Sequence, residues 1–216
     1  MERKSIIQEY FILSASEKGN LSSSAKTGIV ASGITDLVEN DICEKDGKKL
    51  IVKNKLPNKF NHLTSLYEYL SEKPRSIDKI MDDYCMSMTD KRIQKLLVDT
   101  GESLLTENIV TKEKGGLLGN KEVYSPESMY KESLIATLKE SITQKEELSI
   151  HDMALVSILQ ETQKLKQYFS KYEANTLKEK LKLMRKDPNN KALKEMIDYV
   201  DSMTAAMVAC IVVIAN

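Results

Sequence analysis

Met203-Thr204-Ala205-Ala206-Met207-Val208-Ala209-Cys210-Ile211-Val212-Val213-Ile214-Ala215 is the stretch that decides the fold, because its thirteen residues carry no charged side chain. As a helix it extends roughly 20 Å, whereas about 20 residues are needed to cross a bilayer. A segment that is apolar on every face and too short to span a membrane is expected in the centre of a helical bundle. We therefore predict a buried C-terminal helix. Residues 211–214 alone are equally compatible with a buried strand.

The overall composition also favours helices. Only 8 of the 216 residues are Gly and 4 are Pro, which is below ordinary usage and predicts helices joined by short loops. The length suits one domain of ordinary size. We predict a mostly α, single-domain helical bundle over residues 1–216, built around the apolar C-terminal helix and carrying one or two β-hairpins.

Apolar residues at helical spacing predict two short antiparallel helices at the start of the chain, separated by Gly19-Asn20. The second helix is capped within residues 22–24 and ends at about Glu39. Asp46-Gly47 lies between two apolar runs, which is a strong signal for a β-hairpin because Gly accepts a positive φ. A second hairpin is predicted over residues 109–125 with its tip at 115–121. Helices are predicted from Ser128 onward, one of them with Ser149 as its N-cap.

Two segments share a local pattern. Residues 37–42 and residues 104–109 are each a helix end that is followed by an Asn or Asp break and then by a strand. The likeness is too short to indicate an internal duplication. We interpret it as the same local geometry used twice.

Charge and cysteine usage restrict the possible partners. The 32 basic and 32 acidic side chains give a net charge of zero, so no long-range field holds the whole molecule on a phosphate backbone, and no nucleic-acid partner is expected. Three widely spaced cysteines, Cys43, Cys85 and Cys210, favour free thiols in a reducing compartment. The N-terminus lacks the apolar core of an export signal, so a cytoplasmic location is expected.

The residues that usually carry chemistry form no recognisable motif. The two histidines, His62 and His151, have no metal-ligand spacing around them, and the glycine-rich residues 115–121 lack a phosphate-loop pattern and precede a strand. Adjacent carboxylates such as Asp82-Asp83 diverge on a helix and do not form a catalytic pair. We expect no enzymatic activity, no metal and no cofactor.

Basic side chains gather around the first hairpin and predict a local positive surface: Lys45, Lys48, Lys49, Lys53, Lys55 and Lys59. Such a cluster attracts anionic lipid headgroups, each lysine contributing on the order of 1 kcal/mol near the surface. Lysines on an edge strand also serve to prevent aggregation. Both interpretations fit the sequence.

Five segments in order resemble the Golgi phosphoprotein 3 family over nearly the full length. They are residues 8–19, with a leucine-rich helix followed by a charged-Gly break; residues 33–38, followed by Ile42 and the Asp46-Gly47 hairpin; residues 104–110; Tyr124-Ser125; and the apolar C-terminus. The resemblance implies a mostly helical domain with the C-terminal helix inside, a protruding β-hairpin and no enzymatic activity. In eukaryotic members it also implies a peripheral Golgi protein that binds phosphatidylinositol 4-phosphate and the cytosolic tails of glycosyltransferases.

The family's headgroup pocket uses a Trp and an Arg around the second helix and two Arg three residues apart on a later helix. This chain has no Trp. Arg92 and Lys95 stand three apart on the later helix, and Lys26 lies one turn before the second-helix position. These three, together with Lys48 and Lys49, are the predicted headgroup-binding residues. Convergence of Lys26, Arg92 and Lys95 with the hairpin lysines on one flat face would favour membrane binding, whereas scattered positions would count against it. The pattern indicates a divergent, bacterial-type member of the family.

Two other functions remain open at this stage. A helix followed by a Lys-rich hairpin, at 34–53 and again at 93–124, is typical of a winged-helix DNA-binding regulator, although the first of these helices is too apolar to read a groove. The third interpretation is a protein-interaction module that self-associates through the 115–121 hairpin.

Overall fold

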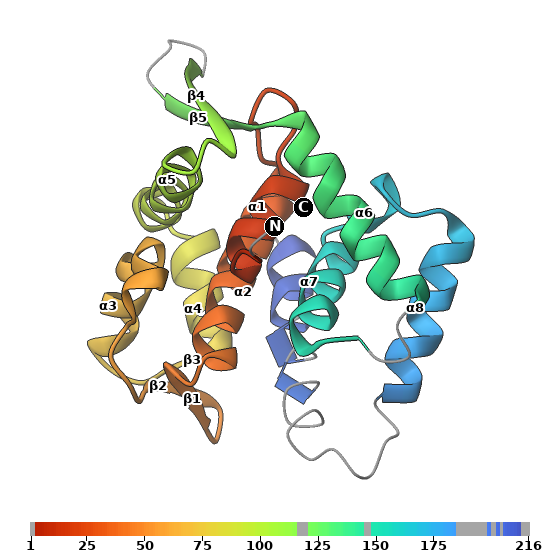
Figure 1. Ribbon diagram of the computed structural model, residues 1–216. Coiled ribbons are helices and arrows are strands. Elements are labelled where there is room, and N and C mark those ends of the chain that lie inside the picture. Colours follow the sequence, from red (N-terminus) through yellow and green to blue (C-terminus); the bar gives the residue numbers. More distant parts are fainter. Residues whose placement is uncertain are drawn as a thin grey trace.

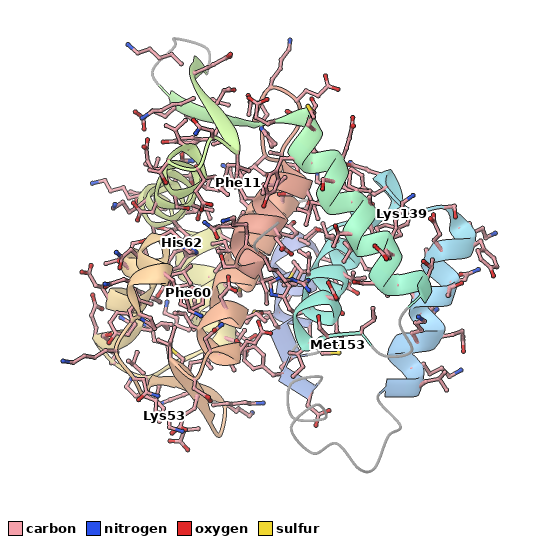
Figure 2. All side chains as sticks on the ribbon, in the orientation of Figure 1. Phe11, Lys53, Phe60, His62, Lys139 and Met153 are labelled. Carbon is pink, nitrogen blue, oxygen red and sulfur yellow. The ribbon has the colours of Figure 1, made fainter. Side chains whose placement is uncertain are left out.

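Helix α1 (Ile6–Ser14) lies at the centre of the molecule in the computed structural model of this chain (Figure 1). The structure describes residues 3–115, 121–144 and 148–184, together with 198–199, 202–203 and 205–212. All nine residues of α1 are buried, including the polar residues Gln8, Glu9 and Ser14. Helix α1 is therefore enclosed by protein on every side, and Figure 2 places Phe11 in the middle of the molecule.

Helix α2 (Ser23–Glu39) packs directly against α1, and both pack against α7 (Ile150–Glu161). The hydroxyl of Ser22 caps α2 by accepting a hydrogen bond from the backbone N–H of Ala25 at 3.2 Å. Ser149 caps α7 in the same way by accepting from the N–H of Asp152 at 3.0 Å. The predicted helix starts at these two serines are confirmed. Since α2 is buried almost throughout, from Ala25 to Leu37, it forms the second layer of the core.

The C-terminal segment is helical at the described positions, but only one side of it is buried. That side carries Tyr199, Met203, Ala206, Met207 and Cys210, whereas Val208 and Val212 are 42% and 53% exposed. The prediction of a C-terminal helix buried on every face is therefore wrong. The central place belongs to α1, because its polar side chains find partners inside the protein and allow all of its faces to be covered. Residues 213–216 lie outside the described part.

Three α-helices, a 3₁₀ helix and a small sheet form one flank of the molecule. They are η1 (Asn58–Leu63, a 3₁₀ helix) leading into α3 (Thr64–Ser71), then α4 (Ile77–Cys85) and α5 (Lys91–Leu105). The sheet has the antiparallel order β1-β2-β3, from β1 (Cys43–Asp46), β2 (Lys49–Val52) and β3 (Arg75–Ser76). The predicted Asp46-Gly47 hairpin is confirmed. The two-residue strand β3 and the 3₁₀ turn had not been predicted.

The second predicted hairpin is formed by β4 (Val110–Gly115) and β5 (Lys121–Pro126), which pair along their length. Its tip, residues 116–120, lies outside the described residues. Both hairpins follow the same kind of helix end. Asp41 and Asn108 adopt φ of 56° and 58°, and the next N–H bonds back to the carbonyl of Leu37 (2.9 Å) and of Leu104 (3.0 Å). The shared local geometry is confirmed.

The opposite flank consists of α6 (Ser128–Gln144), η2 (Leu165–Gln167) and α8 (Lys171–Met184). Helices α6 and α8 pack together, and Lys139 of α6 pairs with Glu173 of α8 at 3.3 Å (Figure 2). The mostly α fold is confirmed. None of the helices in the described ranges has the length and apolarity needed to cross a membrane.

Candidate functional site

The predicted basic residues occupy three different places. Lys26 lies in the first turn of α2, 3.8 Å from the carboxylate of Asp90, and lines a hollow of about 240 Å³ beside β5. Lys95 pairs with Asp99 one turn along α5. Lys48 is exposed in the turn of the first hairpin. The five predicted residues therefore do not all line one hollow, because Lys26 lies at the hollow beside β5 and Lys48 lies in the hairpin turn.

Lys49 and Arg92 do converge, in a pocket of about 460 Å³ between the small sheet and helices α3, α4 and α5. We call this the basic pocket and define it by its lining residues: Lys49, Tyr69, Lys73, Pro74, Arg75, Ser76, Lys79, Asp83 and Arg92. Arg92 also lines a neighbouring hollow of about 270 Å³ together with Lys95. Arg92 and Lys95, three residues apart on α5, therefore line the same hollow.

Backbone pairing brings residues that are distant in sequence to this pocket. Strand β3 pairs with β2 so that Lys49 stands opposite Ser76 and Leu50 opposite Arg75. Ser76 then caps α4 by accepting from the N–H of Lys79 at 3.3 Å. The sheet register and the helix start together fix the positions of the cations that surround the pocket.

Arg75 forms the floor of the basic pocket. Its side chain is only 7% exposed, and it donates to the backbone carbonyls of Tyr69 and Lys73 and to the carboxylate of Glu72. The guanidinium also stacks on the ring of Tyr69, with 3.9 Å between Arg75 Cζ and the ring centroid. Arg92 approaches the same ring at 5.2 Å. Two cation–π contacts therefore hold Tyr69 in place.

Asp83 is the single carboxylate that lines the pocket. It accepts from the hydroxyl of Tyr69 at 2.7 Å and from the ammonium of Lys79 at 2.8 Å. Partial burial acts to raise the pKa of Asp83, but the bonds from Lys79 and Tyr69 outweigh it and lower that pKa below its ordinary value. The pKa of Tyr69 is raised, mainly because burial removes its hydroxyl from water and also because it bonds to the Asp83 carboxylate. At neutral pH the carboxylate is ionised and neutralises Lys79.

Three cations of the basic pocket form no ion pair with the described residues. Arg75 is paired with Glu72 and Lys79 with Asp83, but within the described ranges no acidic side chain pairs with Lys49, Lys73 or Arg92. The pocket therefore carries a surplus of about three positive charges in a protein whose net charge is zero. Two lysine point charges and one planar guanidinium suit an anion of multiple charge, such as a phosphate ester.

Sequence reasoning missed four members of this site: Tyr69, Lys73, Arg75 and Lys79. They lie on or beside α3, β3 and α4, and no periodicity connects them. The one local signal is the run Lys73-Pro74-Arg75, in which Pro74 by itself indicates only the end of a helix. A two-residue strand is too short to be predicted from composition, and without β3 nothing places this run beside Lys49.

A larger cleft of about 610 Å³ lies beside α1, and most of its charged lining residues are held in ion pairs. Lys4 pairs with Glu107, Arg3 pairs with Asp152, and the imidazole Nε2 of His151 lies 2.9 Å from a carboxylate oxygen of Glu9. These contacts fasten the N-terminal segment to α7 and to the end of α5. Of these two hollows, the basic pocket, with its surplus charge, is the better candidate for a binding site.

The described residues contain no cluster of three or more His, Cys, Asp or Glu side chains with the geometry of a metal site. A sequence comparison with curated proteins finds no match to this chain. The sequence model described as Golgi phosphoprotein 3 (GPP34) matches residues 6–200, from the first residue of α1 into the C-terminal segment. This chain belongs to the Golgi phosphoprotein 3 family.

Proposed function

We propose that this chain is a non-enzymatic peripheral membrane adaptor that binds anionic lipid headgroups through the basic pocket. The observation that carries the proposal is the surplus of Lys49, Lys73 and Arg92 in one hollow of about 460 Å³. Membership of the Golgi phosphoprotein 3 family supports the same role. In this proposal the whole chain acts as one domain, and it contacts the membrane surface without crossing it.

The pocket chemistry favours a phosphorylated headgroup over a simple anionic lipid. A phosphate monoester carries nearly two charges at neutral pH and offers several acceptor oxygens, so it can engage Arg92 and both lysines at once. The carboxylate of a serine headgroup carries one charge. Phosphatidylinositol 4-phosphate, the ligand implied by the family, is therefore the specific lipid that we propose.

The test is sedimentation with vesicles of neutral lipid, of neutral lipid with phosphatidylserine, and of neutral lipid with phosphatidylinositol 4-phosphate. We expect binding to rise in that order and to fall as salt is increased, because exposed charges are screened beyond about 10 Å at 0.1 M salt. Equal sedimentation with all three compositions contradicts the proposal.

Charge reversal inside the pocket provides the residue-level test. Lys73→Glu and Arg92→Glu are each expected to weaken binding by about fivefold or more, since each removes one attractive charge worth on the order of 1 kcal/mol and adds a repulsive one. Lys18→Glu is the matched control, because Lys18 is an exposed lysine in the connection between α1 and α2 and does not line the basic pocket. Equal losses in all three variants would show that only net charge matters.

The winged-helix alternative finds no support in the arrangement of α2. A recognition helix must present one face to the DNA groove, whereas α2 is covered by α1, α4 and α7 from Ala25 to Leu37. Self-association through the 115–121 hairpin remains a prediction, because most of that hairpin tip lies outside the described residues. The mass in solution of a chain lacking residues 116–120 tests it.

A further inference from the structure

Two methionines are exposed in the connection between α4 and α5. Met88 is fully exposed and Met86 is 39% exposed, in a segment that also contains Ser87 and Thr89. Methionine is among the residue types most often buried, and an exposed methionine is adaptable and apolar at the same time. Neither side chain belongs to the hydrophobic core.

The connection joins the two helices that contribute Lys79, Asp83 and Arg92 to the basic pocket. Met86 directly follows the last residue of α4, three residues after Asp83. Arg92, on the opposite wall, comes four residues after Met88. The exposed methionines therefore stand between the two helices that carry the pocket's cations.

The acidic residues near the methionines are Asp78, Asp82 and Asp83 of α4 and Asp90 of the connection. Asp78 and Asp82 influence the pKa of Cys210, and Asp83 is engaged by Lys79 and Tyr69. Asp90 lies 3.8 Å from Lys26. Of the surplus cations of the pocket, Arg92 is the one that follows the methionines closely along the chain, two residues after Asp90.

We propose that residues 86–90 form an insertion loop, in which Met88 and Met86 enter the apolar edge of a bilayer while the basic pocket holds a lipid headgroup. This proposal rests on the proposed function and names a membrane, rather than a free phosphate compound, as the source of the anion. A soluble phosphate needs no apolar contact. A membrane interface combines an apolar interior with a layer of anionic headgroups. The two methionines, which alternate with small hydroxyl residues, suit the apolar interior, and the unpaired cations of the pocket suit the headgroups.

The natural sequence contains no Trp, so a single substitution provides a clean reporter. In the Met88→Trp variant we expect the fluorescence to shift to shorter wavelength on adding vesicles that contain phosphatidylinositol 4-phosphate, and to be quenched by lipids brominated on their acyl chains. Met129→Trp is the matched control, because Met129 is 86% exposed near the start of α6 and does not line the pocket. Its fluorescence is expected to stay unquenched.

Affinity gives the second readout. Met88→Asp is expected to weaken vesicle binding by about tenfold, because one apolar side chain is no longer transferred out of water and a repelling charge is added. Met129→Asp is expected to bind as the natural chain does. Circular dichroism of each variant establishes that the fold is retained, which is expected because both side chains are exposed.

The possible outcomes separate the two proposals. If the chain sediments with anionic vesicles but the Met88→Trp fluorescence is neither shifted nor quenched, the insertion loop is overturned and headgroup binding stands. If the same variant is quenched equally by neutral vesicles, insertion stands and the headgroup specificity fails. If the chain sediments with none of the vesicles, both proposals fail, and a protein partner becomes the alternative for the exposed methionines.

Discussion

Asp36 illustrates how one buried side chain organises the centre of the fold. Its carboxylate is 1% exposed and accepts hydrogen bonds from the backbone N–H groups of Ile6 and Ile7, each at 2.8 Å. These N–H groups belong to the first turn of α1 and have no partner within that helix. Burial raises the pKa of Asp36 to about 7, against the lowering effect of the two backbone bonds. A helix that is enclosed on all sides thus receives its cap from a neighbouring helix.

This pKa predicts a pH-dependent stability. Because the pKa of Asp36 is higher in the folded chain than its ordinary value of 3.8, the folded state holds the proton more strongly, and the contribution of Asp36 to the free energy of unfolding falls as pH rises from about 4 to about 7. Asp36→Asn removes this titration. We expect the stability advantage of the natural chain over the variant to shrink across that range, by on the order of 1 to 4 kcal/mol.

Urea denaturation at several pH values measures this difference. His62 has the opposite effect in both proteins, because burial lowers its pKa to about 4 and its contribution to stability is lost on acidification below about 6.5. Subtracting the variant's free energy of unfolding from that of the natural chain at each pH cancels the contribution of His62. A difference that stays constant between pH 4 and 7 would show that Asp36 does not titrate in this range.

At the scale of elements, a glycine in α5 allows the second hairpin to pack closely against that helix. Gly101 lies in the middle of α5, and a Cβ added there would fall well inside the van der Waals radius of the Tyr124 ring on β5. Tyr124 is 3% exposed, and its hydroxyl donates to Glu102 at 2.7 Å. The sequence alone indicates only that Gly101 weakens the helix. The structure shows that the glycine makes room for the hairpin.

Gly101→Ala is therefore expected to destabilise the chain by about 1 to 3 kcal/mol, although Ala is the better helix former by about 1 kcal/mol. The matched background is Tyr124→Ala, which removes the ring. There the same substitution is expected to increase stability, because only the helix propensity remains. Thermal unfolding of the four proteins gives the coupling between the two sites, and a coupling of zero would contradict the packing argument.

At the scale of the whole molecule, burial is distributed unevenly between α1 and α8. Every residue of α1 is buried, whereas Leu177 is the single buried side chain among those of α8 that the structure describes. Amides open locally where few buried contacts hold an element in place, and they open only by global unfolding in the core.

We therefore expect the amides of α1 to exchange with solvent hydrogen at the rate set by global unfolding, and those of α8 to exchange at least about a hundredfold faster. Hydrogen exchange followed by mass spectrometry of peptides from each helix checks this. Helix α7, which packs against α1 and is mostly buried, is the matched comparison and is expected to behave as α1 does. Similar rates in α1 and α8 would contradict the central position of α1.

Local chemistry was sufficient for the elements that depend on nearby residues. Ser149 before α7, the Asp46-Gly47 hairpin, and the matching helix ends at residues 37–42 and 104–109 were all predicted, because each depends on hydrogen bonds or φ values within a few residues. Of the basic pocket, the sequence supplied Lys49 and Arg92. It did not supply Tyr69, Lys73, Arg75 or Lys79.

The amino-acid sequence by itself determined a mostly helical chain of this family with two hairpins and zero net charge, since composition, periodicity and turn residues act locally. Only the tertiary structure decided which helix is central and which cations meet. A polar helix such as α1 is buried once Asp36 and its other partners reach it across the fold. Lys49, Lys73 and Arg92 form one site because β3 pairs with β2, and such long-range pairing leaves no signal in the spacing of residues.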